Sequence, residues 1–258
     1  MKIVINGALG YMGRELSKLC EGGYKNSSIA YLVDARAEEG SGIYPSLASI
    51  QSPDADCIID FSHHTATEAL LSFAVEKGLP CVVCTTGHTD EEIALIHQAS
   101  KSVPVFYSGN MSLGIALLVE LAKTTALAMP EAEIEIVESH HNRKLDAPSG
   151  TALMLANAIT EVRPEAYTNL GRSGHGKRSK DEIGIHSIRM GNIVGIHEVI
   201  IGTPNQTITL KHEAHDRALF AEGALSAAAF LIGKEAGLYD MKSIVSEEKT
   251  SAELSAVI

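Results

Sequence analysis

Short apolar runs rich in β-branched residues alternate with longer amphipathic segments through the first half of the chain. Strands that are apolar on both sides belong in a parallel sheet with helices on both faces. The expected strands are Lys2 to Ile5, Ile29 to Val33, Cys57 to Phe61, Cys81 to Cys84 and Val103 to Tyr107. The expected helices are Tyr11 to Cys20, Thr65 to Lys77 and Asp90 to Ser100, the last of which opens with an acidic turn.

The pattern changes beyond Asn110. An Ala/Leu-rich run predicts a long helix from Leu113 to Met129, and another helix is expected from Thr151 to Val162. Between them, the alternating AEIEIVESHH predicts a half-buried strand, because successive side chains of a strand point to opposite faces. The stretch NLGRSGHGKRSKDEIG is expected to form a surface loop. Three more strands are expected near Ile185 to Arg189, His197 to Gly202 and Gln206 to His212.

An Ala-rich helical segment returns after Asp216, and its apolar face needs a core to cover it. We place this segment on the first domain, so that the second domain becomes an insertion. The expected fold class is therefore α/β. Residues 1–111 and 221–258 are expected to form a domain with a parallel sheet, and residues 112–220 an inserted α+β domain.

The charge balance narrows the range of partners. Lys and Arg total 21 against 32 for Asp and Glu, and a net charge of -11 repels a nucleic-acid backbone. The chain opens with the strand-like MKIVIN and has no run of transmembrane length, so we expect no membrane segment and a cytoplasmic location.

Four cysteines show no disulfide framework, which also fits a reducing cytoplasm. Cys81 and Cys84 do form a CxxC sequence, which a redox or zinc pair would share. They lie in an apolar run that we interpret as a strand, where residues three apart point to opposite faces, so core thiols are favoured.

A glycine turn follows the first expected strand directly. Gly7, Gly10 and Gly13 form GxxGxxG, and Asp34 ends the second expected strand. Small residues let the backbone approach a pyrophosphate at a helix N-terminus, and an acidic side chain at this distance binds the adenosine ribose. The succession of strand, glycine turn, helix, strand and acidic residue predicts a Rossmann-type nucleotide-binding domain. The alternative is a tight turn with Asp34 capping a loop. Because Asp34 repels a 2′-phosphate that Arg36 would neutralise, we expect NADH to be preferred and NADPH tolerated.

Two later strand ends, CTTG from Cys84 and SGNM from Ser108, carry small and polar residues. Ligands of open α/β sheets bind at the carboxyl edge of the strands, so both segments are either simple turns or the lining of a nicotinamide site.

The densest polar cluster in the chain runs from Glu138 to Thr151, from a strand end through a loop into a helix. It combines two imidazoles, a lysine and a helix N-terminus. A substrate carboxylate would lie against the backbone N–H groups of residues 149–151, with Lys144 and His141 adding positive charge. His140 or Lys144 would then deliver a proton while a nicotinamide delivers hydride. The alternative is a solvated loop with incidental charges.

The sequence ESHHNRKLDAPSGTA at residues 138–152 closely resembles the pattern E-x-H-H-x-x-K-x-D-x-P-S-G-T-A of the 4-hydroxy-tetrahydrodipicolinate reductase (dihydrodipicolinate reductase) family. The segments GALGYMG, CTTG, SGNMSLG and RMGNIVGIHEV are similar to further family motifs, so the resemblance spans nearly the whole chain. It implies reduction of 4-hydroxy-tetrahydrodipicolinate to tetrahydrodipicolinate with loss of water, in lysine and diaminopimelate biosynthesis. It also implies a homotetramer assembled through the sheet of the inserted substrate domain.

The resemblance also implies roles for individual residues. His140 is implied to be a proton donor or acceptor, Lys144 a proton donor, and His141, Gly150 and Thr151 binders of the substrate carboxylate. The implied contacts to NADH or NADPH are Gly7, Ala8, Leu9, Gly10, Tyr11, Met12, Asp34, Cys84, Thr85, Thr86, Ser108, Gly109, Asn110 and Met111.

Several positions depart from the family pattern or stay open. Residues 35–56 are too few and too rich in Gly, Ser and Glu for a full helix and strand, so the family's usual third strand is expected to be vestigial. Cys84 replaces the usual Gly of GTTG.

His63 and His64 are either cofactor contacts or polar loop residues, and we favour the loop. The remaining undecided residues are His197, His212 and His215, for which a metal site is disfavoured, and Arg189 and Arg217, taken as interface or substrate-edge charges.

Two other functions are compatible with this fold. One is a different NAD(P)-dependent oxidoreductase acting on small carboxylates, and the other is a nucleotide-sensing protein without catalysis. The HHNRK and PSGT sequences argue against the first, and the presence of both His140 and Lys144 argues against the second.

Overall fold

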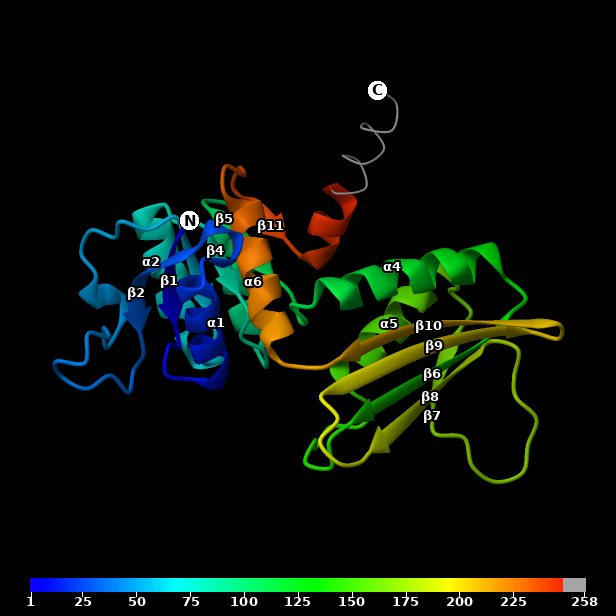
Figure 1. Ribbon diagram of the computed structural model, residues 1–258. Helices are drawn as coiled ribbons and strands as arrows, with labels where there is room; N and C mark the ends of the chain where they lie inside the picture. Colours follow the sequence, from blue (N-terminus) through cyan, green and yellow to red (C-terminus); the bar gives the residue numbers. More distant parts are fainter. Residues whose placement is uncertain (248–258) are drawn as a thin grey trace. The chain divides into compact units, whose positions relative to one another are not determined.

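The computed structural model describes residues 1–247, which form two compact units (Figure 1). Unit 1 comprises Met1–Leu113 and the described residues from Ala218 onward, and unit 2 comprises Gly114–Arg217. The chain enters unit 2 once and leaves it once, so unit 2 is an insertion within unit 1. Residues 248–258 of the segment expected in the first domain lie outside the described residues.

Unit 1 is built on a six-stranded sheet with the order β11-β5-β4-β3-β1-β2, and all of its strand pairs are parallel. The central strands consist almost entirely of buried residues, because helices cover both faces. Its strands are β1 (Lys2–Asn6), β2 (Ser28–Val33), β3 (Cys57–Asp60), β4 (Cys81–Val83), β5 (Pro104–Tyr107) and β11 (Gly237–Tyr239).

The helices of unit 1 are α1 (Tyr11–Glu21), α2 (Thr67–Lys77), α3 (Asp90–Ala99) and α6 (Ala218–Leu231). Helix α6 packs beside α1 and over the middle strands, where the rings of Phe230 and Phe106 meet edge to face with centroids 6.3 Å apart. Helices α2 and α3 pack together over the opposite face, where Ile58 and Val105 join their core. Three short 3-10 helices complete the unit: η1 (Tyr24–Asn26), η2 (Leu47–Ser49) and η3 (His64–Ala66).

The crossover from β2 to β3 is as short as the sequence predicts. Within residues 34–56 the structure has only an isolated bridge from Val33 to Tyr44 and the single turn η2. Strand β2 therefore forms the edge of the sheet, and the third strand typical of the fold is absent from this fully described stretch.

Unit 2 contains a five-stranded mixed sheet with the order β10-β9-β6-β8-β7. Strand β6 lies at its centre, antiparallel to β9 and parallel to β8. The strands are β6 (Glu133–His140), β7 (Tyr167–Leu170), β8 (Glu182–Arg189), β9 (Gly195–Thr203) and β10 (Gln206–Ala214).

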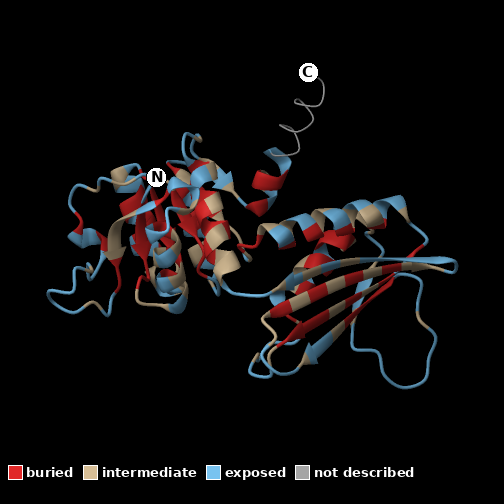
Figure 2. Ribbon diagram, viewed as in Figure 1, coloured by how far each residue is buried: buried red, intermediate tan, exposed pale blue. Residues whose placement is uncertain are grey.

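Helices α4 (Leu113–Ala128) and α5 (Gly150–Val162) supply the other half of the core of unit 2. Buried and half-buried positions alternate along most of β6 and β9, as Figure 2 shows in red and tan, because only one face of the sheet is covered by helices. Ile134 and Ile136 of β6 point into this core, whereas Glu135 and Val137 point to the other face.

Two strands and one loop differ from the expectation. The short strands β7 and β11 carry little of the apolar alternation that marks a strand, and the pairing with β8 and β5 defines them. The stretch expected to be a surface loop is a loop only from residue 171 to 181. Arg172 and Arg178 of this loop both bind the Glu135 carboxylate, so it is anchored to the sheet.

None of the helices within residues 1–247 has the length and apolar character needed to cross a membrane.

We predict that Gly7→Ala lowers the free energy of unfolding by about 2 kcal/mol more than Gly40→Ala does. Both glycines have a positive φ, 87° and 79°, so both variants carry the same backbone strain. A Cβ at Gly7 would also collide with the Phe61 carbonyl, whereas nothing lies near a Cβ at Gly40. Urea denaturation of the two variants measures the difference, and equal losses would contradict the prediction.

Candidate active site

The turn between β1 and α1 is as tight as its glycines allow. The N–H groups of Gly7 and Ala8 both donate to the Val33 carbonyl, and the Gly10 N–H donates to the Gly7 carbonyl. A Cβ at Gly13 would collide with that same Gly7 carbonyl. Helix α1 then begins without a side-chain cap and without an acidic residue in its first turn, so its N-terminus suits an anion such as a diphosphate.

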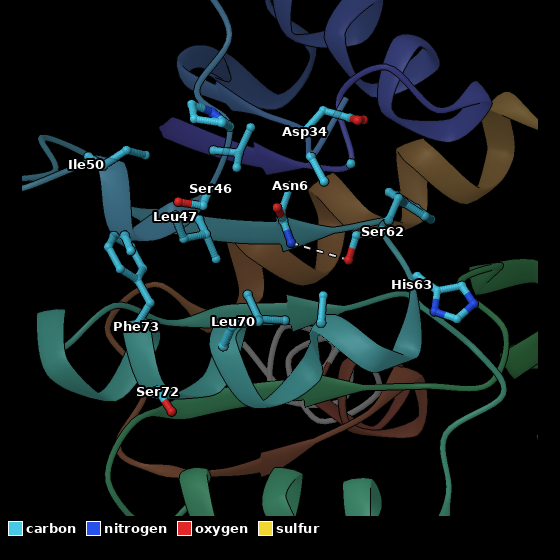
Figure 3. Close-up of a pocket in the computed structure, with 18 of the residues that line it drawn as sticks. Asn6, Asp34, Ser46, Leu47, Ile50, Ser62, His63, Leu70, Ser72 and Phe73 are labelled. Carbon is cyan, nitrogen blue, oxygen red and sulfur yellow. Dashed lines mark hydrogen bonds between the residues drawn. The ribbon is translucent and has the colours of Figure 1, made fainter. Parts of the chain in front are cut away.

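Two cavities open beside this turn within unit 1. The larger has a volume of about 1090 Å³, and apolar side chains such as Leu47, Leu70 and Phe73 project toward it from η2 and α2 (Figure 3). The smaller has a volume of about 560 Å³. The expected cofactor residues in the wall of the larger cavity are Gly7, Gly10 and Asp34. Those in the wall of the smaller cavity are Tyr11, Met12, Cys84, Thr85, Thr86, Ser108, Gly109, Asn110 and Met111.

Ala8 and Leu9 belong to the same turn but act in it through their backbone. The Leu9 N–H donates to the Asp34 carboxylate at 2.9 Å. This bond ties the turn after β1 to the end of β2.

The Asp34 carboxylate is also held by Arg36. One oxygen accepts from the Arg36 backbone N–H and Nε, and the other accepts from Arg36 Nη2 as well as from Leu9. The Arg36 side chain, followed by these backbone bonds, lowers the pKa of Asp34 to about 2 against the effect of burial. Since a carboxylate has about four acceptor positions, a ribose hydroxyl at Asp34 must displace part of Arg36. The Arg36 side chain is 66% exposed, so there is room at the surface for it to be displaced.

The loop after β3 contributes more to the cavities than the sequence suggested. Ser62 and His63 line both cavities, and His64 lines the smaller one, where its Nδ1 pairs with Glu92 at 2.9 Å. Both residues lie on a loop, as we preferred, and their contact with the cofactor stays a prediction. They lie in the wall because η3 turns the chain back toward the sheet edge.

Asp60 supports this loop and was not singled out from the sequence. Its buried carboxylate accepts hydrogen bonds from Asn6, Ser62 and Thr85, which lie at or just after the ends of three neighbouring strands. Burial raises the pKa of Asp60 against these hydrogen bonds. An acidic residue at the carboxyl end of a buried strand was the available signal.

The cysteines of unit 1 are free and buried. Burial raises the pKa of the Cys81 thiol to about 12 and that of Cys84 well above its usual range. Both therefore behave as core thiols.

In unit 2 the polar cluster is organised around Glu138, whose side chain is wholly buried at the end of β6. One carboxylate oxygen accepts from His140 Nδ1 at 2.6 Å and from Arg189 Nη1 at 2.8 Å. The other accepts from Arg189 Nη2 at 2.7 Å and from the Ser149 N–H at 3.1 Å. Burial alone would raise the pKa of Glu138, but these hydrogen bonds lower it well below its usual range.

His140 and His197 form the next layer of the cluster. Their rings meet edge to face with centroids 5.1 Å apart. His197 Nε2 lies 3.1 Å from Ser149 Oγ, which also caps α5 by accepting from the Ala152 N–H. Burial, followed by the charge of His140, lowers the pKa of His197 to about 4, so this ring is neutral near pH 7.

Lys144 and His141 lie on the loop that follows β6. Lys144 Nζ pairs with the Asp146 carboxylate at 2.9 Å. His141 Nε2 lies 3.4 Å from Arg217 Nη2, and desolvation followed by the charges of Arg143 and Arg217 lowers the pKa of His141. Both effects favour the neutral ring in the free protein, and the expected charge of His141 beside a substrate carboxylate stays a prediction.

The N-terminus of α5 also differs from the expectation in one respect. The Ser149 N–H donates to Glu138, so it is not available to a substrate carboxylate. Contacts of substrate with Gly150 and Thr151, which open α5, stay a prediction.

The sequence analysis named three residues of this cluster, Glu138, Arg189 and His197, but gave them no role in it. Arg189 was taken as an interface or substrate-edge charge, but it binds Glu138, and His197 was weighed only as a metal ligand. The available signal for Arg189 and His197 was the sequence RMGNIVGIHEV, which contains both. Its Gly195 also belongs here, since a Cβ at that position would lie 3.2 Å from His140 Nε2.

The residues of unit 1 fit a nicotinamide dinucleotide. A Cβ at Gly7 or Gly13 would fill the turn, and the larger cavity has an apolar side that suits an adenine next to an acidic residue that suits a ribose. A parallel sheet with this turn, together with an inserted unit that carries a buried His–Glu pair beside a helix N-terminus, is the arrangement of a nicotinamide-dependent oxidoreductase.

The comparisons with known proteins give the family. The family descriptions "Dihydrodipicolinate reductase, N-terminus" and "Dihydrodipicolinate reductase, C-terminus" match residues 1–111 and 114–245. The 4-hydroxy-tetrahydrodipicolinate reductase of Caldanaerobacter subterraneus subsp. tengcongensis is 42% identical over 247 residues, covering 95% of this chain and 98% of the relative. That of Clostridium novyi is 43% identical over 248 residues, with coverage of 95% and 98%.

A solved structure has the same fold. Dipicolinate-bound dihydrodipicolinate reductase from Paenisporosarcina sp. TG-14 matches with a TM-score of 0.77 at 23% identity, covering 93% of this chain and 97% of the other. The chain belongs to the dihydrodipicolinate reductase family. It is an oxidoreductase that uses NADH or NADPH to reduce 4-hydroxy-tetrahydrodipicolinate in lysine and diaminopimelate biosynthesis.

We predict that His197 makes the protein less stable as the pH falls from 6.5 to about 4. In this window the unfolded chain binds a proton at His197 that the folded protein excludes, so the free energy of unfolding drops by roughly 3 kcal/mol across it. His197→Gln should flatten this part of the stability profile. The exposed His175→Gln is the matched control and should leave the slope unchanged. Parallel profiles for the parent and both variants, from urea denaturation at each pH, would contradict the prediction.

Proposed function

We propose that the reduction is carried out by His140 and Lys144 as proton carriers, with the cofactor bound by unit 1 and the substrate bound by unit 2. The observation that carries this proposal is the buried pairing of His140 with Glu138 beside the N-terminus of α5. It joins a group that exchanges protons to a place that attracts a carboxylate.

Unit 1 would hold the cofactor along its sheet edge. The turn of residues 7–12 would bind the diphosphate at the N-terminus of α1, and Asp34 would bind the ribose. The CTT and SGNM segments from Cys84 and Ser108 would line the nicotinamide. When bound, the reduced nicotinamide supplies a hydride.

Unit 2 would hold the substrate and supply protons. A substrate carboxylate would be bound at the first turn of α5 by Gly150 and Thr151, with the neutral His141 ring as a further hydrogen-bonding group. Hydride addition to a conjugated imine leaves an anionic carbon or nitrogen. His140 or Lys144 would protonate it, so that the hydride and this one proton complete the reduction, while the water that is lost takes its hydroxyl and its hydrogen from the substrate.

We expect Lys144→Ala and His140→Ala each to lower kcat about 100-fold or more, because a positioned acid or base contributes on this scale. The assay follows loss of reduced-nicotinamide absorbance with substrate freshly condensed from pyruvate and aspartate semialdehyde by a separate synthase. The dissociation constant for NADH should stay within about twofold of wild type, since these residues belong to unit 2.

Lys177→Ala, in the exposed part of the 171–181 loop, is the matched control and should keep the parent kcat. A wild-type kcat for Lys144→Ala would exclude its proposed role. Tight NADH binding with no turnover by the parent protein would point to the sensing function instead.

We further propose that NADH is the preferred cofactor. The support is the Asp34 carboxylate, which stays ionised with a pKa of about 2 and would repel a 2′-phosphate, while the exposed Arg36 would partly neutralise it.

The measurement is kcat/KM for each cofactor in the parent protein and in Arg36→Ala. The parent should favour NADH, and Arg36→Ala should lower kcat/KM for NADPH about tenfold while that for NADH stays within about threefold. Arg14→Ala, on the exposed side of α1, is the control for charge alone and should change neither ratio. A large excess of kcat/KM for NADPH in the parent would overturn the preference.

We also propose a homotetramer that forms through the open face of the sheet in unit 2. The support is a set of partly exposed apolar side chains on the face opposite α4 and α5: Val137, Ile188, Ile196 and Ile200. The free, buried cysteines support our further proposal of a cytoplasmic location.

A further inference from the structure

The Glu138 carboxylate makes contacts that go beyond those of a structural ion pair. Four of its hydrogen bonds come from three separate segments of unit 2: β6 itself, the end of β8 and the N-terminus of α5. Arg189 alone would suffice to pair its charge, since the guanidinium binds both oxygens. The bonds to His140 and Ser149 connect the same carboxylate to the two parts of the proposed substrate site.

The ionised state of Glu138 decides what His140 can do. A carboxylate only accepts hydrogen bonds, so His140 Nδ1, at 2.6 Å, must carry a hydrogen. The neutral ring therefore has its lone pair on Nε2, and a proton can be gained or lost only there. Two neighbours suit this orientation, since Gly195 has no side chain to crowd Nε2 and the His197 ring meets His140 edge to face.

Glu138 also locates the first turn of α5. Its bond to the Ser149 N–H fixes the residue that caps the helix, and Ser149 Oγ receives the Ala152 N–H. The Ser149 hydroxyl is in turn held against the neutral His197 ring. A shift of the carboxylate would therefore move the helix N-terminus and the imidazole together.

We propose that Glu138 is the positioning residue of this active site, fixing the tautomer of His140 and the place of the α5 N-terminus through one carboxylate held by Arg189. This inference rests on the proposed function, because it assigns Glu138 a role through His140. It predicts that neutralising Glu138 impairs catalysis and substrate binding without affecting cofactor binding.

The test is Glu138→Gln in the full-length protein. The amide keeps the size of the side chain but replaces an acceptor with a donor that cannot pair with Arg189 or with an Nδ1–H. We expect kcat to fall at least about tenfold, KM for the substrate to rise, and the dissociation constant for NADH to be unchanged. ¹⁵N chemical shifts of His140, assigned with His140→Gln, should show the Nδ1–H tautomer in the parent and its loss in the variant.

A matched control separates positioning from simple structural support. Glu182 is another buried carboxylate, on β8 in the same sheet, and it is bound by Arg172. Glu182→Gln should lower stability but leave kcat and the His140 tautomer as in the parent. If both variants lose stability alike and both keep kcat, Glu138 is merely structural and the proposal is wrong.

Further variants keep the proposal testable and separate from the proposed function. If Glu138→Gln does not fold, Arg189→Lys is the second variant, because lysine keeps the positive charge but cannot bind both oxygens of Glu138. It should change kcat and the His140 tautomer in the same direction as Glu138→Gln would. Unchanged values would overturn the proposal. Adding Glu138→Gln to His140→Ala should cost little further kcat, because the two act together. Normal kcat in His140→Ala would refute the proposed function, whereas a damaged His140→Ala beside an active Glu138→Gln refutes this inference alone.

Discussion

A carboxylate without access to water must be surrounded by donors, and this constraint on Glu138 shapes the substrate side of the protein. The donors come from β6, β8 and the start of α5, so the chain between β6 and α5 has to return to the sheet end where β8 also finishes. Every group that we assign to substrate or proton transfer lies on this return or beside it. The hydrogen bonds that stabilise the buried Glu138 carboxylate therefore also place the groups that we assign to substrate binding and proton transfer.

Unit 1 depends on a steric constraint in the turn after β1, whereas unit 2 depends on the buried charge of Glu138. The glycine turn leaves no room for side chains at Gly7 and Gly13, which brings the backbone of the turn against β3 and allows α1 to start at the sheet edge. Hydrogen bonds from this turn to the end of β2 set the position of Asp34. The same edge carries Asp60, which ties the ends of three strands together under the cavities.

Much of the fold was predictable because its signals are local. The parallel strands of unit 1 are continuous apolar runs, and the alternation in AEIEIVESHH marks β6 as a strand with one covered face. Strands β7 and β11 were not predictable, since each is short and is defined by its pairing with a neighbour. The anchored loop from 171 to 181 was predictable in composition only, because the Glu135 carboxylate that binds Arg172 and Arg178 lies far away in the sequence.

The sequence by itself determined the two kinds of sheet, the glycine turn with its acidic partner and the candidate reactive residues His140 and Lys144, because each depends on residue type and short spacing. Only the tertiary structure decided that Arg189 and His197 belong to the same cluster as His140, that Asp34 is held by Arg36, and that the Ser149 amide is already bound. The physical reason is that burial and hydrogen bonding between distant segments set the charge, tautomer and availability of a group, and neither can be read from its neighbours along the chain.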